Sequence, residues 1–150
     1  MTRAVRELER AGVPLSLHSY DGVDPDAGDY AVAVAHALGR APGQLFKTLV
    51  ASVDGALGVF VVPADRQLDL RSLGKRAALA DAASAERVTG YVVGGISPFA
   101  QRKRLPTTID ASALEWKTVL VSAGRRGLQV ELDPNDLVRL TDAAVRSIAS

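Results

Sequence analysis

Lys47 places a cation inside an otherwise apolar run. The run, residues 45–53, reads Leu-Phe-Lys-Thr-Leu-Val-Ala-Ser-Val. Strand alternation offers an ordinary interpretation, in which the ammonium points to water and its stem covers apolar surface. The functional interpretation is an ammonium aimed into a pocket, where it could neutralise a phosphate or polarise an acyl carbonyl. Spacing alone does not choose between the two.

Residues 90–98, Gly-Tyr-Val-Val-Gly-Gly-Ile-Ser-Pro, form a second candidate. The adjacent Gly94 and Gly95 allow the backbone to approach a ligand closely, and Pro98 stiffens the exit of the loop. Such a loop can aim N–H groups at a developing oxyanion, whereas its ordinary interpretation is a tight turn. The cationic run that follows suits an anionic substrate, although most charge runs are simply solvated. This run consists of Arg102, Lys103 and Arg104.

A third segment, residues 121–128, joins a strand to another turn of small residues and arginines. It reads Val-Ser-Ala-Gly-Arg-Arg-Gly-Leu and contains Ser122, Arg125 and Arg126. Residues 99–127 carry six Lys and Arg residues against two Asp and Glu residues, in a chain whose formal net charge is only +1. Arginine bias can also reflect genome composition, so charge by itself does not assign a partner.

The composition excludes several classes of protein. The 150 residues are 47% hydrophobic and 23% charged, which argues against a disordered chain. The absence of cysteine excludes a disulfide scaffold, a thiol nucleophile and a thiolate zinc site. The longest uncharged stretch, residues 88–101, is too short and too rich in glycine to span a membrane. Early charges do not fit a signal peptide, so we expect a cytoplasmic protein.

Familiar catalytic motifs are missing from the sequence. It has no Gly-x-x-x-x-Gly-Lys-Ser/Thr loop, no Gly-x-Gly-x-x-Gly and no Gly-x-Ser-x-Gly. Two histidines, His18 and His36, cannot build a three-histidine metal site, and they make a Ser-His-Asp triad a poor interpretation. An ordinary strand or packing role suits both. We therefore expect neither a metal nor a cofactor.

Local patterns predict one mixed α+β domain over residues 1–150. Asp54-Gly55 between two β-rich runs predicts a hairpin, and hairpins beside helices argue against a purely parallel doubly wound sheet. Caps and periodicity place the remaining elements. The expected helices are 2–11, 30–38, 69–79 with an interruption at Gly74, 81–89, and one opened by Asp133-Pro134; the expected strands are 15–20, 45–53, 56–62, 107–109, 117–121 and 128–132.

Together these segments resemble the YbaK/EbsC family of aminoacyl-tRNA deacylases, free-standing relatives of the editing domain of bacterial prolyl-tRNA synthetases. The resemblance runs over nearly the whole chain and implies the fold of that family, a mixed α/β domain with a twisted, barrel-like β-sheet flanked by helices. The Gly-Gly-Ile-Ser-Pro stretch and its Arg-Lys-Arg-Leu-Pro extension look most like the branch that clears cysteine from proline tRNA. The matching stretches are 2–5, 46–49, 67–70, 89–98, 101–110, 121–122, 126–128 and 131–132.

The resemblance also implies roles for individual residues. The pocket lysine of the family matches Lys47, and its Gly-x-x-x-Pro element matches Gly94 to Pro98. The N–H groups of Gly94, Gly95 and Ile96 are therefore expected to stabilise the oxyanion. The expected substrate contacts are Tyr20, Tyr30, Thr48, Ser97, Pro98 and Ser122, and the expected contacts to tRNA phosphates are Arg102, Lys103, Arg104, Arg125 and Arg126.

Two positions depart from the family pattern. Ala123 stands where relatives often have glycine, and Gln129 stands where close relatives carry an acidic residue. If that acid shapes the pocket, the amino-acid selectivity implied by the resemblance does not carry over to this chain.

The implied substrate is mischarged Cys-tRNA(Pro), and the resemblance implies that the thiol of this substrate attacks its own ester carbonyl. These segments hold no good general base, which fits such a mechanism. Prolyl-tRNA synthetase is the partner that this reaction implies. Two alternatives stay open. One is a related deacylase that uses an activated water on alanyl or seryl esters, and the other is a tRNA-binding module without catalysis.

Overall fold

Asp54 and Gly55 join the two longest strands, β2 (Phe46–Val53) and β3 (Ala56–Pro63), in a computed structural model that describes residues 1–26 and 28–150. Their φ angles of 51° and 87° are the pair of positive values that a type I′ hairpin turn requires. The strands pair in antiparallel register from Val53 opposite Ala56 to Phe46 opposite Pro63. The predicted hairpin is confirmed.

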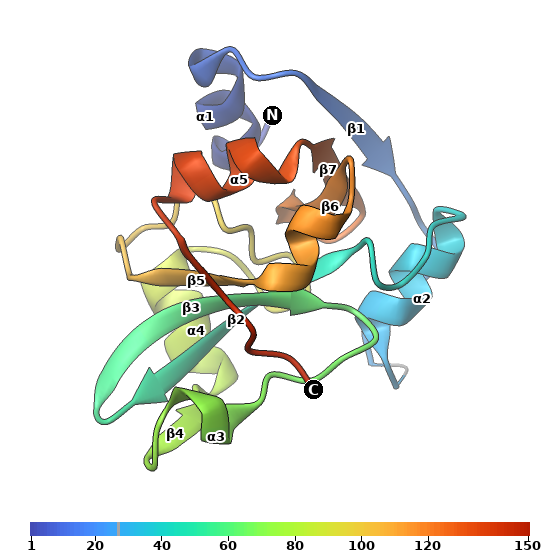
Figure 1. The fold of residues 1–150 in the computed structure, drawn as a ribbon. Coiled ribbons are helices and arrows are strands. Elements are labelled where there is room, and N and C mark those ends of the chain that lie inside the picture. Colours follow the sequence, from blue (N-terminus) through green and yellow to red (C-terminus); the bar gives the residue numbers. More distant parts are fainter. Residues whose placement is uncertain (27) are drawn as a thin grey trace.

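A five-stranded sheet grows from this hairpin in the order β4-β2-β3-β5-β8. β4 (Ala77–Leu79) is antiparallel to β2, whereas β5 (Thr107–Asp110) is parallel to β3 and β8 (Ala144–Arg146) is parallel to β5. The sheet is therefore mixed, as expected from a chain with hairpins and helix-linked strands. Figure 1 shows it in the lower half of the molecule.

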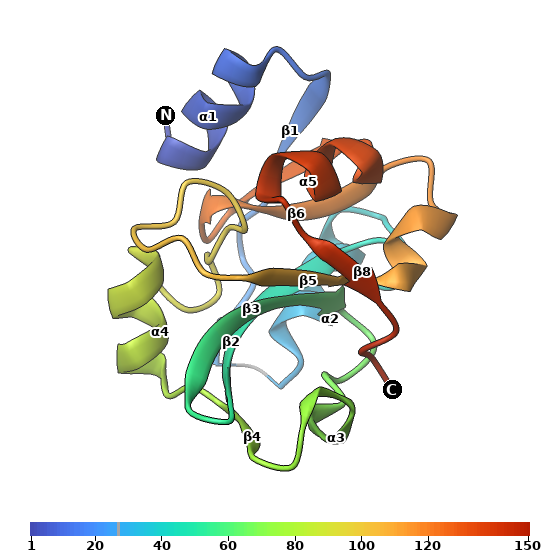
Figure 2. The same ribbon diagram turned by 60° about the vertical axis from the view of Figure 1, so that its left-hand side comes forward.

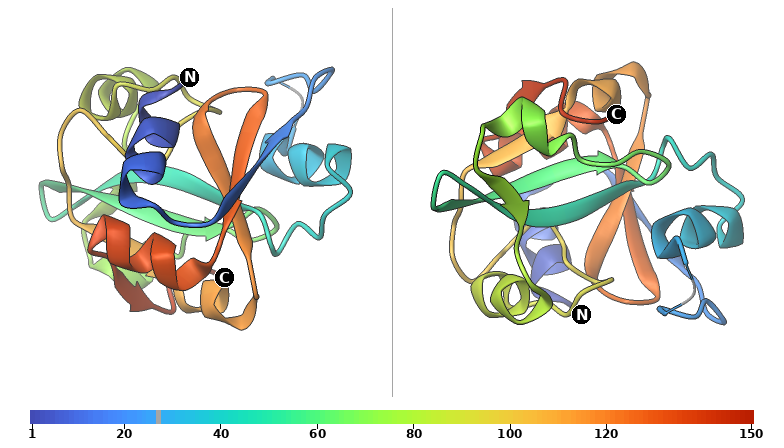
Figure 3. Two further views of the ribbon diagram at one scale, coloured as in Figure 1. Left: turned by 90° about the horizontal axis from the view of Figure 1, so that it is seen from above. Right: turned by 90° about the horizontal axis from the view of Figure 1, so that it is seen from below.

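A second sheet has three antiparallel strands in the order β1-β7-β6. They are β1 (Leu15–Ser19), β7 (Leu128–Leu132) and β6 (Val119–Arg125). The two sheets cross when seen along the vertical axis (Figure 3), and they join where Leu45 forms a parallel bridge with Leu120. The expected mixed α/β fold is confirmed, and its β-structure consists of two sheets that meet at this bridge.

Helices cover the crossed sheets on several sides. α1 (Arg3–Ala11) and α5 (Pro134–Thr141) lie together over one face, while α2 (Tyr30–Ala37) and α4 (Ala82–Thr89) stand at opposite sides (Figures 2 and 3). The side chains of Thr2 and Asp133 cap α1 and α5 as predicted, and the side chain of Asp81 caps α4. The main core lies between α1, α5 and both sheets, around Leu8, Phe46, Val61, Val121 and Leu137.

The prediction of a helix over residues 69–79 is wrong. Only one helical turn forms, α3 (Leu70–Leu73), and a 3₁₀ turn, η1 (Ala111–Glu115), lies elsewhere in the chain. Gly74 follows α3 with φ of 155°, and the chain then extends so that Ala77–Leu79 pairs with the edge of β2. Edge pairing outweighs the helical propensity of the alanines here. Within the described residues, none of the helices has the length and apolar character needed to cross a membrane.

Candidate functional site

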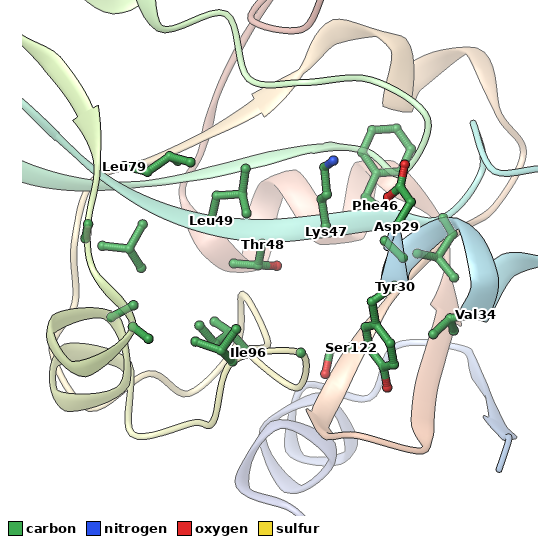
Figure 4. Close-up of a pocket in the computed structure, with 18 of the residues that line it drawn as sticks. Asp29, Tyr30, Val34, Phe46, Lys47, Thr48, Leu49, Leu79, Ile96 and Ser122 are labelled. Carbon is green, nitrogen blue, oxygen red and sulfur yellow. The ribbon is translucent and has the colours of Figure 1, made fainter. Parts of the chain in front are cut away.

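A cavity of about 370 Å³ runs along residues 45–50 at the edge of β2 (Figure 4). It occupies the interval between the Leu45–Leu120 bridge and the point where Ala51 pairs with Leu79 of β4. Its other walls come from α2, α4, the loop 91–98 and strands β6 and β7. Most of the wall is aliphatic, and the polar side chains that line it are Asp29, Tyr30, Lys47, Thr48, Ser122 and Gln129.

Lys47 is half-buried at this cavity. Its Nζ donates a long hydrogen bond of 3.5 Å to the carbonyl oxygen of Ala64. Burial lowers the pKa of the ammonium, and the more distant carboxylates of Asp29 and Asp65 act in the opposite direction. Among the described residues, no carboxylate lies within salt-bridge distance of this cation. The ammonium is therefore available to an anionic ligand.

Thr48 leaves β2 on the side opposite to Lys47, as strand alternation requires (Figure 4). Its side chain faces the part of the cavity where Ile96 and Ser122 lie. Gln129 of β7 pairs with Ser122 of β6 across the ladder, so both side chains leave the sheet on one face and both line the cavity. The Ser122 hydroxyl accepts a hydrogen bond of 3.2 Å from the Gly124 N–H.

Tyr20 and Tyr30 are joined by a hydrogen bond of 2.9 Å between their hydroxyl groups. Tyr30 lines the cavity, whereas Tyr20, the other expected substrate contact of this pair, does not line it and instead holds the Tyr30 hydroxyl. Burial raises the pKa of the Tyr30 phenol, and the hydrogen bond to Tyr20 acts in the same direction. Tyr30 is therefore a neutral hydrogen-bonding group at ordinary pH, and it is no base.

The glycine loop contributes Gly94 and Ile96 to the wall, but Gly95 does not line the cavity. The N–H of Gly95 donates to the carbonyl oxygen of Val92 at 2.8 Å, so this one of the three expected oxyanion donors is already used. Within residues 1–26 and 28–150, the N–H groups of Gly94 and Ile96 have no hydrogen-bond acceptor.

Ser97 and Pro98 do not reach the cavity, contrary to the expectation that they contact substrate. Ser97 is fully buried, and its hydroxyl accepts the N–H of Phe99 at 3.2 Å. Pro98 lines a smaller hollow beside α5. Both residues shape the loop behind the wall, and Tyr91 fixes the same loop through a 2.6 Å hydrogen bond from its hydroxyl to the carbonyl oxygen of Phe99.

The expected phosphate contacts form two groups. Arg126 lies beside the cavity, because its Nε donates to the carbonyl oxygen of Val93 at 2.9 Å and a Cβ on Gly94 would lie 2.9 Å from that Nε. Arg125 is exposed next to it. Arg102, Lys103 and Arg104 are also exposed, on the segment that leaves the glycine loop, and Arg104 borders the smaller hollow.

An ionic cluster that the sequence did not suggest supports α2 and the small sheet. Both nitrogens of the Arg40 fork lie 2.9 Å from the two oxygens of Glu131, which also accepts from Thr118 at 2.6 Å. His18 Nε2 lies 2.8 Å from Glu131 Oε1, which confirms an ordinary strand role for that histidine. These partners lower the pKa of Glu131 to about 2. Sequence spacing gives no signal for a cluster that depends on strand register.

Ala123, the first of the two residues that differ from the family pattern, does not line the cavity. Ala123 is fully buried in the main core, and its carbonyl oxygen accepts the hydroxyl of Thr2. Gln129, in contrast, lines the cavity directly. Of the two unusual positions, the second is therefore the one that can affect a ligand.

Known proteins are similar to this chain in sequence. A family described as the aminoacyl-tRNA editing domain matches residues 24–140. EbsC of Enterococcus faecalis, assigned as a Cys-tRNA(Pro)/Cys-tRNA(Cys) deacylase, is 33% identical over 156 aligned residues, which cover 99% of this chain and 93% of EbsC. The multifunctional Ser/Thr-tRNA deacylase ProXp-y of Escherichia coli K12 is 34% identical over 119 residues, covering 72% of this chain and 71% of ProXp-y.

Solved structures have the same architecture. A crystal structure assigned as a trans-editing enzyme for prolyl-tRNA synthetase superposes with a TM-score of 0.79 at 23% identity, over 100% of this chain and 99% of that one. A hypothetical protein superposes with a TM-score of 0.83 at 27% identity, over 99% and 100% of the two chains. From the family match and the full-length similarity to EbsC, we conclude that this chain belongs to the aminoacyl-tRNA editing domain family.

Proposed function

We propose that the chain is a trans-editing deacylase that clears Cys-tRNA(Pro) after a charging error by prolyl-tRNA synthetase. The observation that carries the proposal is that Lys47, half-buried and without a salt bridge among the described residues, lines one cavity together with Gly94 and Ile96. The N–H groups of Gly94 and Ile96 have no hydrogen-bond acceptor among the described residues. EbsC, assigned to the same substrate, aligns over 99% of this chain.

The N–H groups of Gly94 and Ile96 are the proposed oxyanion donors. Negative charge develops on the ester carbonyl oxygen during cleavage, and one fixed donor of this kind typically lowers a barrier by ~2.7–4 kcal/mol. Gly95 does not donate a hydrogen bond to the oxyanion in this proposal, because its N–H already donates to the carbonyl oxygen of Val92. Its contribution is the packing of the loop.

Lys47 and the arginines would hold the rest of the substrate. The Lys47 ammonium is proposed to bind the terminal phosphate or ribose, at the side of β2 away from Thr48. Arg102, Lys103, Arg104, Arg125 and Arg126 are exposed and suit contacts to acceptor-stem phosphates, which carry little sequence information. Transfer of the tRNA from prolyl-tRNA synthetase is part of this proposal.

The thiol of the substrate is the proposed nucleophile. Its sulfur attacks the ester carbonyl carbon, the bond from that carbon to the ribose oxygen breaks, and the thiol proton passes to the ribose oxygen. The products are a free ribose hydroxyl and a cyclic thioester. The cavity wall, as far as the structure describes it, contains no histidine to serve as a base. Holding the thiol against the carbonyl can be worth ~7–11 kcal/mol.

Hydrolysis of a seryl ester by water is the second candidate function. It is favoured by ProXp-y, whose name gives Ser/Thr-tRNA as its substrates. The polar Thr48 and Gln129 side chains in the cavity also suit a hydroxyl-bearing amino acid.

The test is amino acid release from Cys-, Ser- and Ala-tRNA(Pro) by the wild type, Lys47→Ala and the control Lys75→Ala. Lys75 is exposed and lies outside the cavity. The proposal expects rapid clearance of the cysteinyl ester, a large loss in Lys47→Ala and no loss in Lys75→Ala. Clearance of the seryl ester alone would favour the water-dependent candidate. Binding of tRNA without clearance of any ester would contradict both reactions and favour a tRNA-binding module without catalysis.

A further inference from the structure

Two buried polar atoms at the cavity have no hydrogen-bond partner. They are Thr48 Oγ1 and Gln129 Oε1. Every other buried side-chain nitrogen or oxygen atom of the described residues has a hydrogen-bond partner. Thr48 and Gln129 are only 8% and 5% exposed. Buried polar atoms in folded proteins are normally paired, so two unpaired ones at one cavity require an explanation.

A structural role does not explain Gln129. Its neighbours on the ladder already have partners, since Ser122 accepts from Gly124 and His18 lies against Glu131. Glu131, the next residue on this face of β7, is held by Arg40, Thr118 and His18. Gln129 lines the cavity together with Ser122, but its side-chain oxygen, unlike the Ser122 hydroxyl, has no partner among the described residues.

We propose that Gln129, together with Thr48, recognises the side chain of the amino acid carried by the substrate. The two unpaired atoms match a small neutral side chain that carries a hydrogen-bond donor on Cβ, the hydroxyl of serine or the thiol of cysteine. The methyl group of alanine leaves both atoms unpaired. The inference rests on the proposed function, and it assigns the specificity of the site to this pair.

Thr48 and Lys47 leave β2 on opposite sides and therefore line different parts of the cavity. Lys47 leaves β2 on the opposite side from Thr48, where it can meet the phosphate or ribose (Figure 4). Thr48 and Gln129 are then left for the amino acid side chain. An amide is neutral and both accepts and donates, so it suits a hydroxyl better than a thiol, whose S–H is a weak donor.

Binding of unreactive substrate analogues tests the inference without catalysis. The probes are 3′-amino-3′-deoxyadenosine joined by an amide to serine, cysteine or alanine, titrated by calorimetry into the wild type, Gln129→Met and Thr48→Val. We expect the wild type to bind the seryl analogue at least about tenfold more tightly than the alanyl analogue, with the cysteinyl analogue between them. Gln129→Met should reduce the seryl-to-alanyl ratio to within about twofold. Thr48→Val should reduce it in part.

Stability of the free protein separates recognition from a structural role. Methionine is close in shape to glutamine and needs no partner, so Gln129→Met should unfold at the same temperature as the wild type or higher. A clearly lower unfolding temperature would overturn the inference, as would a wild-type ratio near one, a ratio that Gln129→Met leaves unchanged, or failure of all three analogues to bind. Selective binding without deacylation of any tRNA would instead keep the inference and refute the proposed reaction.

Discussion

Gly95 packs its α-carbon directly against the backbone of Arg126, and a Cβ at Gly95 would lie 2.7 Å from the Arg126 nitrogen. The same Cβ would lie 2.8 Å from the carbonyl carbon of Arg125. The glycine loop and the β6–β7 turn therefore touch through backbone atoms, which cannot move aside as a flexible side chain can. This contact fixes Gly94 and Ile96 at the cavity.

Substituting Gly95→Ala should push the loop off the turn. We expect a loss of roughly 1–3 kcal/mol in the free energy of unfolding, as for other overpacked sites, and a larger relative loss in the deacylation rate because the N–H groups of Gly94 and Ile96 move. Urea denaturation and single-turnover rates measure the two effects. Gly43→Ala is the control, because its Cβ would meet its nearest neighbour at an ordinary 3.5 Å. Wild-type stability and rate in Gly95→Ala would contradict the packing argument.

Substituting Arg126→Lys should remove the hydrogen bond from Nε to the Val93 carbonyl oxygen while keeping a positive charge. Because this bond holds the loop at the cavity, we expect kcat to fall about fivefold and the affinity for tRNA to change little. Arg125→Lys serves as the control, since the one acceptor of the Arg125 guanidinium among the described residues is the carbonyl oxygen of its neighbour Arg126. Equal kcat values for the two variants would exclude a positioning role for Arg126.

Binding of tRNA should weaken steeply with salt. Each phosphate neutralised by Lys or Arg contributes about one unit to the negative slope of log K against log salt concentration. We expect Arg102→Ala or Arg104→Ala to make this slope about one unit shallower and to weaken binding similarly for different tRNAs. Arg71→Ala is the matched control, because Arg71 is exposed on α3 outside both cationic groups. Slopes that do not change would place these arginines outside the tRNA interface.

Acid should destabilise the protein partly through Glu131. Its folded-state pKa of about 2 lies below its ordinary value of 4.5, so the carboxylate stabilises the fold above pH 4.5 and this contribution is lost as the pH falls from 4.5 toward 2. Glu131→Gln should lower the free energy of unfolding by roughly 1–3 kcal/mol at pH 7. Near pH 2 the free energies of unfolding of the variant and the wild type should differ by less than at pH 7. Chemical denaturation across this pH range measures it.

The exposed Glu115 provides a comparison for this titration. Glu115→Gln should leave the free energy of unfolding nearly unchanged at every pH, because the carboxylate is not part of the Arg40 cluster. A pH-independent effect of Glu131→Gln would show that the charge of Glu131 is not what stabilises the fold.

The sequence by itself determined the features that depend on neighbours along the chain. Thr2 and Asp133 could be assigned as caps, and Asp54-Gly55 as a hairpin turn, because each depends on backbone groups only a few residues away. The resemblance located Lys47, Thr48, Tyr30, Gly94, Ile96 and Ser122, all of which line one cavity.

Only the tertiary structure decided what lies across that cavity and behind it. Strand register places Gln129 beside Ser122 and gathers Arg40, His18 and Thr118 around Glu131, and no local pattern encodes a register between distant strands. Backbone packing uses the N–H of Gly95 and buries Ser97, although both stand in the same motif as Gly94. Residues 77–79 became a strand because the edge of β2 was available there, which is a property of the folded sheet and not of its sequence.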